Sequence, residues 1–161
     1  MTVSTLAKAG LLVAALGLAG GPAQAAVSPL RALAGSWAGG GVISMASGEQ
    51  ERLRCRASYD VDGGGTALRL NLRCASDSYN FDLSSQIDYR SGAISGEWTE
   101  SSRNASGTIE GRAAGDHIEA AATGPGFSAN LSLTTRGSRQ IVTIRPQGGD
   151  ISAVSLELSR R

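Results

Sequence analysis

The chain has 161 residues, with 15 basic and 14 acidic side chains, one histidine and a formal net charge of +1. This balance argues against a nucleic-acid binder, which needs a basic surplus for phosphate contacts, so we expect no nucleic-acid partner. Lys8 is the only lysine, so every basic residue beyond it is an arginine. The length suits one domain.

The first residues have the features of a bacterial secretory signal. Lys8 supplies a positive charge, an apolar run over 11–19 follows, and Ala23-Gln24-Ala25 fits the small-x-small site of signal peptidase. The apolar run is too short to span a bilayer. We therefore expect residues 1–25 to be removed. The remaining residues 26–161 should form a single periplasmic or secreted domain without a transmembrane segment.

Beyond Gly35, short alternating runs are separated about every ten residues by Gly, Asn, Asp or Ser. This spacing is typical of antiparallel barrels and sandwiches, and a period of two sends alternate residues to opposite faces. The pattern predicts about ten strands and at most one turn of helix around 28–34. The run 141–145 is ambiguous, because its apolar residues do not keep to one face.

Strands that follow one another without a long crossover predict an all-β fold, an antiparallel up-and-down barrel of about ten strands. A two-sheet β-sandwich is the alternative. Gly39-Gly40-Gly41 in the first strand favours the barrel, because a strand that bends sharply to close one favours residues without Cβ. A membrane-embedded barrel is disfavoured, since its outer face would need apolar side chains edged with aromatics.

Two cysteines in an exported protein predict one disulfide, Cys55 to Cys74, with free thiols as the alternative. Both fall on the apolar side of one predicted hairpin. Two cysteines and the single His117 do not complete a tetrahedral metal site without carboxylates, so we expect no metal.

The segment Leu33-Ala34-Gly35-Ser36-Trp37 resembles the Gly-x-Trp start of lipocalin-like (calycin) barrels. The resemblance implies that Trp37 closes one end of the barrel and that the open end takes a small apolar ligand. Ten-stranded haem-binding members of that superfamily use a C-terminal His, and none follows His117 here, so we expect no cofactor. The region 94–107 is similar to small exported alphaproteobacterial proteins of unknown function.

Arginines gather on the predicted second and third strands. The alternation sends all of them to the outer side of one hairpin: Arg52, Arg54, Arg56, Arg69 and Arg73. Two interpretations remain open. In the first, acidic neighbours (Asp82, Asp88, Glu49 and Glu51) neutralise the arginines. In the second, the arginines form an anion-binding patch for an envelope surface or an acidic partner.

Catalytic motifs are scarce, and we expect the chain not to be an enzyme. The Gly-x-Ser-x-Gly elbow of hydrolases is missing from the sequence. Asp82 and Asp88 share one strand face and fit a solvated surface better than an acid/base pair. By the same alternation, His117 faces outward.

Small-molecule binding is the function we expect, in a periplasmic module for an apolar or lipid-like ligand. Inward positions mix large apolar residues with Ala and Gly, which either leave a cavity or let the walls collapse together. The residues expected to line a cavity are Tyr59, Phe81, Trp98, Phe127 and Leu131. The alternative is a protein-interaction module, such as a periplasmic protease inhibitor or an envelope-associated factor, with residues 26–30 projecting from the domain.

Overall fold

The described chain folds into ten strands, as its polar–apolar alternation predicts, and one short 3-10 helix. A computed structural model describes residues 27–161, so the expected signal peptide at 1–25 lies outside the described residues. The elements are η1 (Pro29–Leu33), β1 (Gly35–Met45), β2 (Gln50–Val61), β3 (Ala67–Ala75), β4 (Asn80–Arg90), β5 (Ala93–Glu100), β6 (Ala105–Ala114), β7 (His117–Gly124), β8 (Phe127–Arg136), β9 (Arg139–Pro146) and β10 (Ile151–Arg160).

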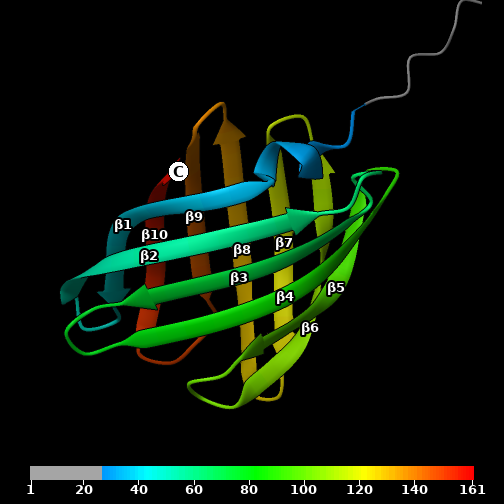
Figure 1. Ribbon diagram of the computed structural model, residues 1–161. Helices are drawn as coiled ribbons and strands as arrows, with labels where there is room; N and C mark the ends of the chain where they lie inside the picture. The colour runs from blue at the N-terminus through cyan, green and yellow to red at the C-terminus, as the bar shows by residue number, and fades with distance from the viewer. Residues whose placement is uncertain (1–26) are drawn as a thin grey trace, which may run out of the picture.

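The strands form a closed antiparallel barrel in which each strand pairs with its neighbour in the chain and β1 pairs with β10. This confirms the predicted up-and-down barrel rather than the sandwich. In Figure 1, β2 to β6 cross the front of the view obliquely, and β7 to β10 run upright behind them. Within the described part of the chain, no helix has the length and apolar character needed to cross a membrane.

Strand β1 joins the two parts of the barrel by bending. Figure 1 shows it bending downward, and it pairs with β2 over Gly35–Ser44 and with β10 over Trp37–Met45. Gly39 and Gly41 face inward at this bend, where a Cβ would lie 2.0 Å from the carbonyl oxygens of Glu157 and Ser155 respectively. Only glycine therefore lets the backbones of β1 and β10 approach this closely.

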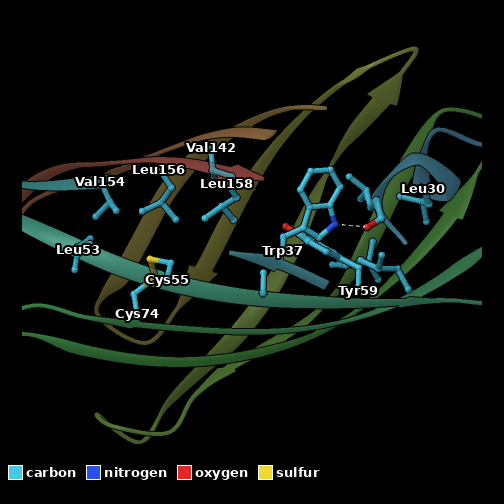
Figure 2. Packing of buried hydrophobic residues seen from close by; sticks show 14 of the residues in the cluster. Leu30, Trp37, Leu53, Cys55, Tyr59, Cys74, Val142, Val154, Leu156 and Leu158 are labelled. Atoms are coloured by element: carbon cyan, nitrogen blue, oxygen red, sulfur yellow. Dashed lines mark hydrogen bonds between the residues drawn. A yellow bond between two sulfur atoms is a disulfide. The ribbon is translucent and has the colours of Figure 1, made fainter. Parts of the chain in front are cut away.

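The predicted disulfide joins Cys55 of β2 to Cys74 of β3, which are direct cross-strand partners. Both side chains are buried, as the alternation predicts. Figure 2 shows the bond within the apolar core, on the side of the barrel where Leu53, Val154 and Leu156 also lie. The bond thus fixes the register of the β2–β3 hairpin from the inside.

The core is packed unevenly around the barrel. Inward side chains of β1, β2 and β10 are almost fully buried; these include Trp37, Ile43, Leu53, Leu156 and Leu158. Several inward side chains of β3, β4, β6 and β8 remain half-buried, although Ser85 and Ile87 of β4 are buried. The half-buried side chains include Leu70, Leu72, Leu83, Ile109, Leu131 and Leu133. The side that holds the β1–β10 seam is therefore better filled than the opposite side.

Candidate functional site

The barrel is covered at one end, called the closed end here. Helix η1 lies across it, with Leu30 and Leu33 buried and the Ser28 hydroxyl donating to the carbonyl of Gly65 at 2.5 Å. The helix covers this end because Leu30 and Leu33, three residues apart, fall on the same side of a 3-10 turn. Residues 28–33 thus pack on the domain. The alternative inhibitor role would instead require residues 26–30 to project from it.

Trp37 lies directly below η1 at the closed end. Its side chain is 1% exposed, and its indole Nε1 donates to the carbonyl of Leu33 at 2.7 Å. Figure 2 shows the ring beside Leu30 and Tyr59. Arg160 covers the ring from outside, with its guanidinium carbon 4.3 Å from the ring centroid. The residue that the resemblance assigned to barrel closure therefore lies under the helix that covers this end.

Tyr59 lies at the closed end too, apart from the other residues predicted to bind ligand. It pairs in register with Gly35 at the start of β1, and its hydroxyl donates to Oε1 of Gln140 at 2.8 Å. Tyr59, Gln140 and Thr135 are all buried. The structure therefore places Tyr59 within a polar link of the packed core.

The end opposite η1, called the open end here, carries a pair of aromatic rings. Trp98 on β5 and Phe127 on β8 meet edge to face with ring centroids 5.3 Å apart, although β6 and β7 run between their strands. Gly124 makes this possible, because a Cβ there would lie 3.0 Å from the Trp98 ring. Trp98 is 7% exposed and Phe127 is 39% exposed. The pair thus runs from the interior to the solvent at the rim.

Phe81 belongs to a second aromatic group at the open end. Its ring stacks with that of Tyr79 at 6.5 Å between centroids, and the Arg103 guanidinium lies 4.8 Å from the Phe81 centroid. Arg103 comes from the β5–β6 turn, whose conformation the alternation does not predict. The sequence therefore predicts Phe81 as a site residue but does not indicate its neighbours Tyr79 and Arg103.

Glu100 is a buried carboxylate at the same end that the sequence analysis did not single out. It accepts hydrogen bonds from the backbone N–H of Asp82 at 2.9 Å and of Arg103 at 2.8 Å, and from the hydroxyl of Ser102. Arg103 Nη1 lies 3.6 Å from the same carboxylate. Burial by itself would raise the pKa of Glu100, but these hydrogen bonds outweigh it and hold the pKa below its ordinary value. Glu100 thus holds the β5–β6 turn against β4.

The half-buried apolar side chains between the two ends line the interior. Leu72, Leu83 and Leu131 each lie within a strand that is hydrogen-bonded on both sides, and their chain neighbours face outward. By this alternation their side chains point to the inside of the barrel. Leu131 also contributes to the lining of an outer hollow between β6 and β9. Leu131, the fifth predicted ligand residue, belongs to this set and pairs in register with Ala120 of β7.

Two hollows also occur on the outer wall. One of about 470 Å³ lies across β6 to β9, with Arg112, Glu119, Asn130 and Arg145 around a floor that includes Ala121. Another of about 200 Å³ lies across β3 to β5. Both are lined mainly by outward polar side chains, so neither is the apolar interior site that the sequence predicts. The five predicted patch arginines also lie on the outer wall, where all are exposed.

The barrel architecture defines the fold class: a closed, ten-stranded antiparallel up-and-down barrel. No family model matches the chain, and no curated protein matches its sequence. Among solved structures, the chain is similar to Rv2717c from M. tuberculosis, with 14% identity and a TM-score of 0.66 over 82% of this chain and 94% of that one. It is also similar to the S-type phycobiliprotein lyase CPES from Guillardia theta, with 11% identity and a TM-score of 0.58 over 82% and 89%. At these identities the likeness shows the fold.

Proposed function

We propose that the mature chain is an exported bacterial binding protein that holds an apolar, lipid-like small molecule in the underfilled half of its barrel. The supporting observation is the accessible surface that Leu72, Leu83 and Leu131 keep although they face inward. Covering this surface with an apolar ligand stabilises a complex by about 25 cal/mol per Å² buried. The likeness to a phycobiliprotein lyase supports small-molecule binding at the level of the fold.

The ligand enters at the open end in this proposal. Trp98, Phe127 and Phe81 surround the opening, while η1 and Trp37 cover the other end. Phe127 is the more exposed member of the rim pair, and it follows the Gly124-Pro125-Gly126 connection between β7 and β8. In this proposal Tyr59 belongs to the packed core at the closed end, which forms the floor of the site, and it does not contact the ligand.

A matched pair of substitutions tests the interior site. Ala120 faces inward and is half-buried, whereas its neighbour Ala121 faces outward and is exposed. Ala120→Phe should reduce affinity for the neutral apolar probe N-phenyl-1-naphthylamine by roughly tenfold or more, because the new ring occupies the ligand volume. Ala121→Phe should leave that affinity within about twofold of the wild-type value.

Probe fluorescence measures binding, and circular dichroism checks that both variants fold. Equal affinity of the wild type and Ala120→Phe would rule out the interior site. Native mass spectrometry of protein purified from the periplasm then identifies the retained ligand by its mass.

Export and a binding rather than catalytic role are parts of the same proposal, as is kinship with small exported alphaproteobacterial proteins. N-terminal sequencing of the mature protein should begin at Ala26 or within a residue or two of it. The presence of Met1 on the mature protein would overturn the periplasmic or secreted location. The protein-interaction alternative would need residues 26–30 to project from the domain, and the burial of Leu30 within η1 weighs against it.

A further inference from the structure

The outer wall of β2 and β3 carries the arginine patch, defined as Arg52, Arg54, Arg56, Arg69 and Arg73. All five side chains are exposed and project away from the barrel interior. Arg56 and Arg73 are direct cross-strand partners, so two like charges face each other. Such a pair is destabilising unless an anion offsets it.

Acidic side chains offset only part of this charge. Asp82 of β4 pairs with Arg73 at 3.2 Å, and it is the only ion pair that any patch arginine forms within residues 27–161. Asp88 lies opposite Ala67 instead, and Glu51 accepts hydrogen bonds from Ser76 and Ser78. Arg69 has Asp60 as its cross-strand partner. The row of Arg52, Arg54 and Arg56, by contrast, has no acidic cross-strand partner on β1 or β3.

Small neighbours leave this row uncovered. On the neighbouring strand β1, the residues opposite Arg52, Arg54 and Arg56 are Val42, Gly40 and Ala38. On the other side, Ala75 of β3 lies opposite Arg54. Alternate residues of a strand lie about 7 Å apart. The row is thus a line of separate guanidinium groups on a shallow wall, each with several N–H donors free to bind a phosphate.

We propose that the arginine patch docks the protein on an anionic lipid surface, with Arg52, Arg54 and Arg56 each binding a lipid phosphate. A row of separated cations fits many separate phosphates better than one carboxylate. A protein partner would instead be expected to bury aromatic or large apolar anchors, and Val42 is the largest apolar side chain facing the row across β1. This docking goes beyond the proposed function and does not depend on an occupied interior.

Vesicle sedimentation tests the proposal with the processed protein. At an ionic strength of about 10 mM, the wild type should bind phosphatidylcholine vesicles that contain phosphatidylglycerol and should not bind phosphatidylcholine alone. Arg52→Ser/Arg54→Ser/Arg56→Ser should lower binding by on the order of 100-fold, given the usual contribution of each arginine at an anionic membrane.

The matched control is Arg90→Ser/Arg112→Ser/Arg145→Ser, which removes the same charge from exposed arginines on β4, β6 and β9. It should lower binding by less than about fivefold, roughly the contribution of one arginine. Equal losses in the two triple variants would overturn the patch in favour of general charge attraction. No wild-type binding to anionic vesicles would overturn the lipid proposal and direct the search to an acidic protein.

Salt dependence keeps the test decisive if the patch variant does not fold. Wild-type binding should fall steeply as the ionic strength rises, because exposed ion pairs are screened. Binding that is insensitive to salt would overturn the proposal without any variant.

Discussion

The hydroxyl of Tyr59 on β2 and the amide oxygen of Gln140 on β9 are joined by a 2.8 Å hydrogen bond through the closed end of the barrel. Their strands are not neighbours, because β1 and β10 lie between them. Gln140 also donates from Nε2 to the hydroxyl of Thr135 at 3.2 Å. Burial raises the pKa of the Tyr59 phenol, so Tyr59 keeps its proton and remains a donor at neutral pH.

Tyr59→Phe should therefore lower the free energy of unfolding by about 1–3 kcal/mol, because it leaves the buried Gln140 oxygen without a donor. Tyr79→Phe is the control, since the Tyr79 hydroxyl makes no hydrogen bond with residues 27–161; its effect should stay within about 0.5 kcal/mol. Urea unfolding measures both. Equal losses in the two variants would show that the link to Gln140 contributes nothing.

Reduction of the Cys55–Cys74 disulfide should lower stability by roughly 3 kcal/mol, because the bond closes a loop of about twenty residues in the unfolded chain. Thermal unfolding with and without reductant measures the change. Cys55→Ala/Cys74→Ala is the control, and reductant should leave its melting curve unaltered. An unchanged wild-type midpoint under reductant would contradict the prediction.

Glu100→Gln should destabilise the protein by roughly 1–3 kcal/mol at neutral pH, because it weakens charge-assisted hydrogen bonds at the β5–β6 turn. The folded-state pKa of Glu100 is lowered from 4.5. Its contribution to stability is therefore complete above pH 4.5 and is lost as the pH falls through the lower folded-state pKa. The difference between wild type and variant should shrink accordingly in acid.

Urea unfolding over a series of pH values measures this difference. Glu97→Gln provides the control, because Glu97 lies on the same strand, faces outward and is exposed. A difference between wild type and Glu100→Gln that stays constant from pH 7 into acid would mean that the ionised carboxylate is not what holds the turn.

Arg160→Ala should loosen η1. The Arg160 guanidinium donates to the carbonyls of Ala32 and Ala34 and lies over Trp37, so its loss should cost about 1–2 kcal/mol. Trypsin should then cleave faster after Arg31, within the helix. Arg161→Ala is the control, because the contact of Arg161 with Ser36 uses its backbone N–H. Unchanged cleavage in Arg160→Ala would show that Arg160 does not hold the helix in place.

Alternation was sufficient to predict the barrel, because the pleat of a strand imposes a period of two on every buried face. It was ambiguous at β9 for a specific reason: Ile141 faces outward and is 51% exposed, while the polar Gln140 takes an inward position. A buried amide and an exposed isoleucine reverse the usual assignment of side chains to faces. The Tyr59 hydroxyl, which satisfies Gln140, comes from a distant part of the chain.

The candidate site was only partly predictable. Trp98 and Leu131 face inward as their strand positions require, but which end of the barrel a residue reaches depends on register. Tyr59 precedes the turn beside η1, so it joins the closed end, whereas Phe81 follows a turn at the open end. The burial of Glu100 depends on backbone N–H groups in a turn, and side-chain periodicity carries no information about those.

The seam between β1 and β10 makes closure the final event in assembly. A chain that emerges with its N-terminus first presents the edge of β1 without a partner until residues 151–160 have followed. The contacts that complete the barrel also span the longest separation in the sequence, which slows folding. Truncation of the last strand would leave two long unpaired edges, each able to template pairing with another chain. With the ten residues of β10 the sheet closes into a barrel, and without them it would be an open sheet prone to aggregation.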